Sequence, residues 1–186
     1  MYTTLLLSGL LSAAFAAPLV SRQSDFKAAE GTLATCDATS DKFLSLVMGP
    51  EQYDVIFDHA CAGVLPGCAY PENLPEDTVC TQTIDYQLTG PKNITLNALV
   101  EDKASHNKLS KWAANFAVTP AEQPEDSAGV FITRDECKGY FYYLLMKSGE
   151  EGCWYENLGP SAGSLTVGGS SSLKNTVFTV SFVERK

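Results

Sequence analysis

Six cysteines constrain the fold of this chain more than any other feature, because disulfides join segments that are distant in sequence. They are Cys36, Cys61, Cys68, Cys80, Cys137 and Cys153. An even number of cysteines in an exported chain predicts three disulfides, although six cysteines allow 15 pairings. We expect Cys137 to pair with Cys153, since they bracket a predicted strand and turn, and closing such a ~15-residue loop contributes about 3 kcal/mol. The other four are expected to pair among themselves.

The first 16 residues predict a secretory signal peptide. An apolar block at residues 5–11 is followed by Ala14 and Ala16, whose small side chains suit cleavage before Ala17. The block is shorter than the roughly 20 residues that a membrane-spanning helix needs. The C-terminal end is charged where a lipid-anchor signal would be apolar. We therefore expect a secreted, extracellular protein without a membrane anchor.

One secreted domain is expected over residues 23–186, with a helical, disulfide-bonded part at 36–80 and a β part at 81–186. Residues 17–22 form a propeptide if a protease cuts after Arg22; the alternative is a flexible mature terminus.

The composition fits one soluble globular domain and excludes some partners. Of the 186 residues, 45% are hydrophobic and 19% charged, with 22 acidic against 13 basic side chains and a net charge of −9. A chain of this charge is repelled by nucleic acid and by anionic membrane surfaces. No nucleic-acid partner is expected.

The N-terminal part shows helical periodicity. A helix is predicted from Pro50, with Gly63 as its stop, because apolar side chains recur at i, i+3, i+4 and i+7: Tyr53, Ile56, Phe57 and Ala60. A second helix is predicted over residues 43–48, with a strand at 44–48 as the alternative. Residues 61–80 carry three prolines and two glycines and predict a loop without regular structure.

After Cys80 the period of the apolar residues changes to two, which indicates strands. A hairpin is predicted from residues 84–88 and 94–100 with a turn at 90–93. A central strand is predicted at residues 140–146, which are apolar on both faces. Further strands are predicted at residues 112–118, 129–133, 153–156, 165–167 and 176–183. The predicted fold class is α+β and mainly β: an antiparallel β-sandwich or barrel with a short helical, disulfide-bonded N-terminal part.

Two candidate binding or modification sites follow from these strands. Asn93 begins the N-x-T acceptor for N-glycosylation at a turn-to-strand edge, and its alternative role is in the turn itself. Aromatic side chains on the predicted strands form a candidate ligand surface that stacks on sugars; the alternative is that they fill the core. The candidate residues are Tyr140, Tyr142, Trp154 and Tyr155.

No catalytic residue and no metal or other cofactor is predicted. Residues 159–163 match G-x-S-x-G, but no helix follows and the last histidine, His106, precedes the motif. His59 and His106 lack further ligands at metal-binding spacing. Four acids near the aromatic strands show no spacing that selects a glycosidase pair: Glu136, Glu150, Glu151 and Glu156.

The alanine-rich signal, the A-P-L-V-S-R-Q stretch after it and six cysteines in an acidic chain resemble the small cysteine-rich secreted proteins of filamentous fungi. The resemblance covers the general layout and the first 23 residues, and it implies an effector that contributes to virulence. Such a protein binds an extracellular host protein, and inhibition of a host protease or another defence hydrolase is one form of this function. Its contacts are expected on loops, at residues 61–80 and 120–126. The alternatives are a glycan or small-ligand binder or small glycosidase that uses the aromatic strands, and a structural protein of the cell wall.

Overall fold

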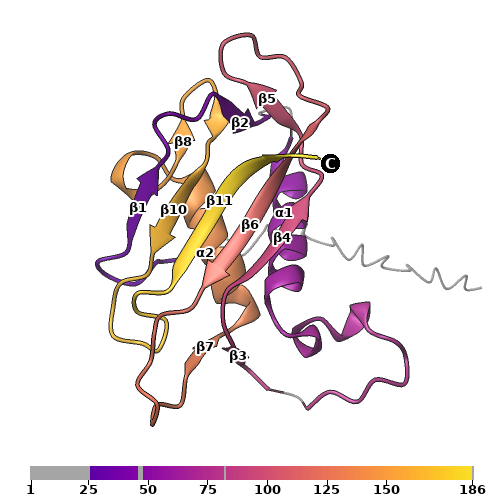
Figure 1. The fold of residues 1–186 in the computed structure, drawn as a ribbon, viewed down its shortest axis with the longest axis vertical. Coiled ribbons are helices and arrows are strands. Elements are labelled where there is room, and N and C mark those ends of the chain that lie inside the picture. Colours follow the sequence, from indigo (N-terminus) through magenta and orange to yellow (C-terminus); the bar gives the residue numbers. More distant parts are fainter. Residues whose placement is uncertain (1–25, 46–47, 82, 186) are drawn as a thin grey trace, which may run out of the picture.

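A five-stranded antiparallel sheet forms the centre of the molecule (Figure 1). The computed structural model describes residues 26–45, 48–81 and 83–185; the predicted signal peptide and propeptide lie outside these ranges. In spatial order the strands are β1 (Leu33–Cys36), β10 (Gly163–Thr166), β11 (Val177–Glu184), β6 (Trp112–Thr119) and β4 (Lys92–Leu96). The strands predicted at residues 112–118 and 176–183 are confirmed as β6 and β11, the two longest.

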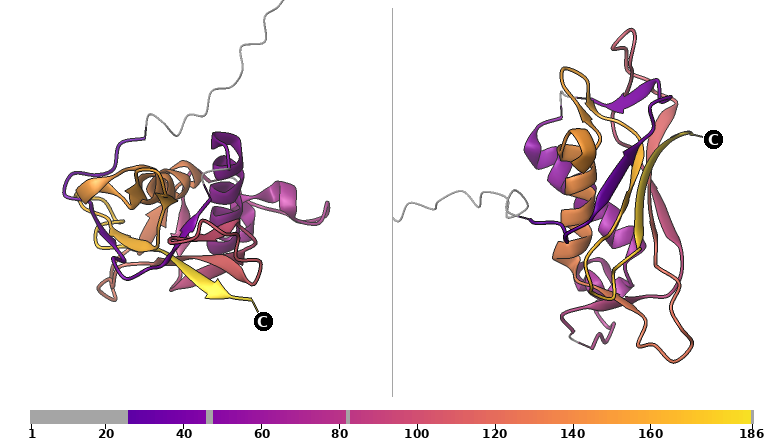
Figure 2. Two further views of the ribbon diagram at one scale, coloured as in Figure 1. Left: turned by 90° about the horizontal axis from the view of Figure 1, so that it is seen from above. Right: turned by 90° about the vertical axis from the view of Figure 1, so that its left-hand side faces the viewer.

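Two helices cover one face of this sheet (Figure 2, right). They are α1 (Pro50–Val64) and α2 (Arg134–Met146). Phe141 of α2 contacts Phe116 of β6 and Phe178 of β11 edge-to-face, with ring centroids 5.2 Å apart in both pairs. The predicted class, α+β and mainly β with antiparallel strands, is confirmed. The layer packed on the central sheet consists of helices, in place of the second sheet that a sandwich requires.

Helix α1 confirms the helix predicted from Pro50 and ends at Val64, one residue after the predicted stop at Gly63. Its last turn lies close to the edge strand β4. A Cβ atom at Gly63 would stand 2.3 Å from Cδ1 of Ile94, so the absence of a side chain at Gly63 lets the helix and the strand approach. This contact fixes where the helical layer meets the sheet edge.

The strand predicted at residues 140–146 is wrong, because this segment belongs to α2. Thr133 caps the helix: its Oγ1 accepts from the Glu136 N–H at 3.0 Å, and the Thr133 N–H donates to Glu136 Oε2 at 2.8 Å. Buried side chains then recur with helical spacing: Cys137, Tyr140, Phe141, Leu144 and Leu145. An unbroken apolar run fits either period, and the capping box decides for the helix.

The other strands form three two-stranded sheets. They are β2 (Lys42–Leu44) with β5 (Val100–Asp102), β3 (Tyr86–Leu88) with β7 (Val130–Ile132), and β8 (Trp154–Tyr155) with β9 (Gly159–Pro160). The predicted hairpin is wrong, because β3 pairs with β7 while β4 pairs with β6. The start of the helix predicted at residues 43–48 is likewise wrong, since Phe43 and Leu44 lie in β2; residues 46–47 lie outside the described ranges.

All six cysteines form disulfides, which confirms three bridges. The predicted Cys137–Cys153 pair is wrong, and of the other four cysteines only Cys68 and Cys80 pair with each other. The pairs are Cys36–Cys153, Cys61–Cys137 and Cys68–Cys80, with Cα–Cα distances of 5.4, 6.0 and 5.4 Å. The Cys153 N–H donates to the Leu144 carbonyl, seven residues or about 10 Å along α2 from Cys137. Because disulfides need Cα atoms within about 7 Å, this helix separates Cys137 from Cys153. Three disulfides fit an extracellular protein.

Candidate interaction surface

The four residues of the predicted aromatic ligand surface are divided between α2 and β8, and one of them, Tyr140, is buried. Tyr140 is 4% exposed and packs on Phe26 and Phe178, with centroids 5.0 and 5.1 Å away. Tyr142 is half-buried on the same helix, edge-on to the ring of another helix residue, Phe57. These residues lie on α2, where successive side chains point in different directions. Tyr140 is a core residue.

The other two aromatic residues, Trp154 and Tyr155, are half-buried neighbours on β8. The Lys103 ammonium lies 5.3 Å from the Tyr155 ring centroid. They therefore sit on a different element from Tyr140 and Tyr142.

The serine of the G-x-S-x-G match has a structural role. Ser161 is buried, and its hydroxyl donates to the Lys42 carbonyl at 3.3 Å. Its N–H donates to the Cys153 carbonyl at 2.9 Å. Ser161 thereby ties the β8–β9 region to β2, next to the Cys36–Cys153 disulfide.

The histidines and the candidate acids are exposed or take part in local structure. His59 is exposed on α1, and His106 is exposed in a turn with φ 55°, its ring edge-on to Phe43. Glu136 belongs to the α2 capping box. The remaining acids, Glu150, Glu151 and Glu156, are exposed.

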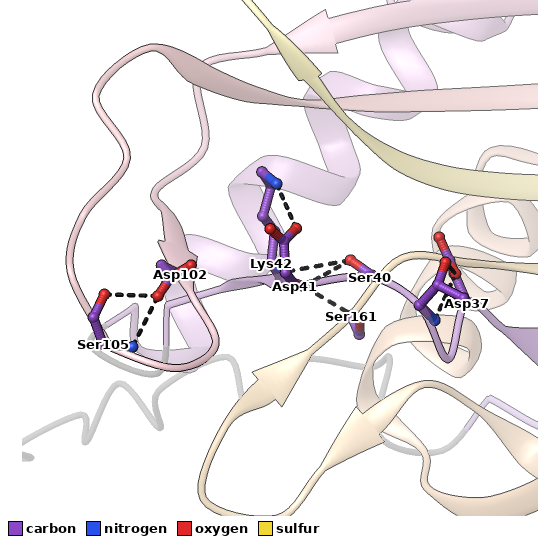
Figure 3. A network of polar contacts seen from close by, with 8 residues as sticks. Asp37, Ser40, Asp41, Lys42, Asp102, Ser105 and Ser161 are labelled. Atoms are coloured by element: carbon purple, nitrogen blue, oxygen red, sulfur yellow. Dashed lines mark hydrogen bonds and ion pairs between the residues drawn. The ribbon is translucent and has the colours of Figure 1, made fainter.

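Asp37 and Asp102 stabilise turns beside β2 (Figure 3). Asp37 accepts hydrogen bonds from the Thr39 hydroxyl at 2.6 Å and from its N–H at 2.9 Å. Asp102 accepts from the Ser105 hydroxyl at 2.7 Å and from its N–H at 2.8 Å. These hydrogen bonds lower the pKa of each carboxyl group below its usual value. Both side chains are therefore anionic turn-forming groups at neutral pH.

Between these turns, Lys42 holds β2 in place. Its ammonium pairs with Asp41 and lies 4.0 Å from the ring centroid of Trp112. Ser40 donates from its hydroxyl to the Lys42 carbonyl at 3.1 Å (Figure 3). The whole network fixes the chain around β2.

A second polar cluster fixes the segment that follows α1. The Arg134 guanidinium carbon lies 3.8 Å from the ring centroid of Tyr70, which is 2% exposed. Arg134 also pairs with Glu72 at 2.9 Å and with Asp58 at 3.3 Å, and Lys138 pairs with Asp58 at 3.1 Å. We call these five residues the clamp. They join α1, α2 and the two short 3-10 helices at Gly67–Ala69 and Pro71–Asn73.

The clamp shifts the acid equilibrium of Asp58. Partial burial favours the neutral carboxyl group and raises the pKa of Asp58. The hydrogen bond and the charge attraction from Lys138, together with those from Arg134, lower this pKa by a larger amount. The net result is a pKa below the usual value. Asp58 is therefore ionised at neutral pH, and its charge is matched by the two cations.

Beyond the clamp the chain extends away from the sheet before it returns to β3 (Figures 1 and 2). Val79 is 95% exposed and Ile84 is 87% exposed, the highest values among the exposed large hydrophobic side chains. Three acids share this stretch, and we call the five residues the tip: Glu76, Asp77, Val79, Ile84 and Asp85. Large apolar side chains at this exposure have lost no water on folding and are available to a partner.

Both apolar residues of the tip adjoin fixed points. Val79 precedes Cys80, which is bonded to Cys68 at the edge of the clamp. Ile84 lies two residues before β3, and the Thr83 hydroxyl donates to the Asp85 carbonyl at 2.8 Å. The Thr78 N–H donates to the Pro75 carbonyl at 2.9 Å. The prediction that residues 61–80 lack regular structure is therefore wrong in part, because α1 continues to Val64 and 3-10 helices follow at Gly67–Ala69 and Pro71–Asn73.

Asn93 is exposed on the edge strand β4. Its register partner on β6 is Ala117, and the same row continues across the sheet through Thr179, Ser164 and Thr35. These neighbours are small and uncharged. Thr95, the threonine of the N-x-T motif, donates a hydrogen bond from its hydroxyl to Asn115 Oδ1 at 3.2 Å. The position leaves space for a glycan on the face of the sheet opposite the helices.

Comparisons with protein-family models, with curated proteins and with solved structures found no match to this chain. Within residues 26–45, 48–81 and 83–185, no helix has the length and apolar character needed to cross a lipid bilayer. The same ranges hold no group of three or more His, Cys, Asp or Glu side chains placed to bind a metal ion.

Proposed function

We propose that this protein is a secreted, effector-like binding protein that engages an extracellular host protein. Inhibition of a host protease or another defence hydrolase is the form of this function that we propose to test first. The observation that carries the proposal is the tip: two large apolar side chains, 95% and 87% exposed, next to a disulfide. Binding residues are concentrated on loops held by a rigid scaffold, and an exposed apolar side chain supplies area that a partner can bury.

The roles of the candidate catalytic groups also support binding. Ser161 donates to a main-chain carbonyl, and Glu136 caps a helix. Tyr140, one of the four aromatic residues named for the glycan-binding alternative, is in the core. These groups stabilise the fold, whereas the tip contributes little to it.

Recovery of a partner from host extracellular fluid tests this function. The mature protein is immobilised, bound proteins are identified by mass spectrometry, and the activity of host proteases is measured with and without the soluble protein. We expect a specific partner and, for the inhibitor form, stoichiometric loss of one protease activity. Recovery of no host protein, together with unchanged protease activity, contradicts the proposal.

We also propose that Asn93 carries an N-linked glycan in the secreted protein. Its exposure on an edge strand and the small uncharged neighbours in its row support this assignment. The secreted wild type is expected to lose mass on treatment with a peptide N-glycosidase. Asn93→Gln should abolish the shift, and the control Thr95→Ser should keep it because N-x-S is also an acceptor. An unshifted wild type would contradict the assignment.

A further inference from the structure

The tip combines exposure with restraint. Burial of a fully exposed valine or isoleucine by a partner tightens binding by about tenfold or more. Flexible loops lose part of such a gain to ordering. Here Val79 is next to the Cys68–Cys80 disulfide, and Ile84 is next to the Thr83–Asp85 hydrogen bond and β3. Less conformational freedom is therefore lost on binding.

The charge around these side chains selects the chemistry of the partner. From Ala60 to Pro91 the chain contains four acidic residues and no Lys, Arg or His, a net charge of −4. Three of the four acids belong to the tip, while Glu72 is already paired with Arg134. Within the described residues, none of the three tip acids forms an ion pair. Exposed carboxylates attract a basic surface and repel an acidic one.

We infer that Val79 and Ile84 insert into an apolar pocket on a basic host protein, whose cationic rim pairs with Glu76, Asp77 and Asp85. This assignment rests on the proposed binding function and names its contact residues and the charge of its partner. An anionic lipid surface is disfavoured as the partner, because the same three carboxylates repel it.

The test compares one substitution at two exposed valines. Val79→Asp changes the tip, and Val55→Asp is the matched control on α1, where Val55 is 54% exposed. Both variants and the wild type are immobilised and exposed to the basic fraction of host extracellular fluid, retained on a cation exchanger. The captured protein is identified, purified, and its Kd is measured for each variant.

We expect Val79→Asp to weaken binding at least about tenfold, since burial of one valine corresponds to a factor of that size. Ile84→Asp should have a similar effect, and Val55→Asp should stay within about twofold of the wild type. The Tm of Val79→Asp should match that of the wild type, because a side chain that is 95% exposed makes few contacts. Raised salt should slow association with the wild type.

The contrary outcomes separate this inference from the proposed function. If the wild type and Val79→Asp bind the identified partner with equal Kd, or if the unfractionated fluid yields only an acidic partner, the inference is overturned and the binding function stands. Binding of the wild type to phosphatidylcholine vesicles with no host protein captured overturns both. Capture of no host protein from the basic fraction overturns the inference. If no host protein is captured from the unfractionated fluid either, the proposed function is overturned as well.

Discussion

The clamp and the tip are neighbours in the fold, because Tyr70 and Glu72 of the clamp lie in the same segment between Cys68 and β3 as the tip, yet the two differ in almost every physical respect. The clamp buries an aromatic ring under a guanidinium group and balances its charges between α1 and α2. The tip exposes two large apolar side chains and three carboxylates without matching cations in its own sequence. The difference indicates a division of roles: the clamp stabilises the fold, and the tip is available for recognition.

Of the two disulfides that hold the clamp and the tip, Cys61–Cys137 should contribute more to stability than Cys68–Cys80. Both cysteines are fully buried, and the bridge closes a loop with a sequence separation of 76. The double variant Cys61→Ala/Cys137→Ala should lower the free energy of unfolding by about 4 kcal/mol in urea titrations. The Cys68→Ala/Cys80→Ala variant should lose less than about 3 kcal/mol, because its separation is 12 and the released segment gains entropy in the folded state too. A larger loss of stability in Cys68→Ala/Cys80→Ala than in Cys61→Ala/Cys137→Ala would contradict the proposed division between clamp and tip.

Truncation of the aromatic ring in the clamp should cause the next largest loss of stability. Tyr70→Ala should lower the free energy of unfolding by about 3 kcal/mol, since it removes a buried ring and the surface on which Arg134 stacks. Tyr70→Phe is the control that retains the ring. If chemical denaturation shows Tyr70→Ala to be as stable as Tyr70→Phe, the clamp has no structural role.

The clamp should also confer an acid-dependent contribution to stability, smaller than that of the ring. The pKa of Asp58 is lowered in the folded state. Its contribution is therefore complete above the unfolded-state pKa of about 3.9 and is lost as the pH falls through the folded-state pKa. Urea titrations of wild type and Asp58→Asn should differ at pH 6 and converge below pH 4. A difference that persists unchanged at low pH would show that the charge of Asp58 is not responsible.

The smallest effect on stability is expected at the tip. Val79→Ala should change the free energy of unfolding by no more than about 0.5 kcal/mol, because the side chain is 95% exposed. A thermal melt of the unliganded protein measures this directly. A loss of 2 kcal/mol would mean that Val79 packs against the fold and is not free to meet a partner.

Parts of the fold with a single clear periodicity could be predicted from the sequence. Strands β6 and β11 alternate, and α1 has an apolar stripe at helical spacing, so each matched its prediction closely. Helix α2 was missed because residues 140–146 are apolar at nearly every position, which removes the period. The signal that could have revealed it is the T-x-x-E capping box from Thr133 to Glu136.

The disulfide pairing and the candidate surface depend on tertiary arrangement. Once Cys137 lies on a helix it faces Cys61 of α1, a contact that loop length alone does not reveal. Ile84 was expected in a strand, but β3 begins at Tyr86 and leaves Ile84 exposed. Burial of Tyr140 likewise follows from packing of α2 on the sheet. The residue types alone did not predict the Cys61–Cys137 contact, the exposure of Ile84 or the burial of Tyr140.

Disulfide mapping of the mature protein tests the division between clamp and tip most directly. Non-reducing digestion with mass spectrometry should recover peptides linked through Cys61–Cys137 and through Cys68–Cys80, with Cys36–Cys153 as the third bridge. The first bridge joins the helices beneath the clamp, and the second holds the tip. A Cys137–Cys153 link, or a free thiol at Cys80, would contradict the structure on which this division depends.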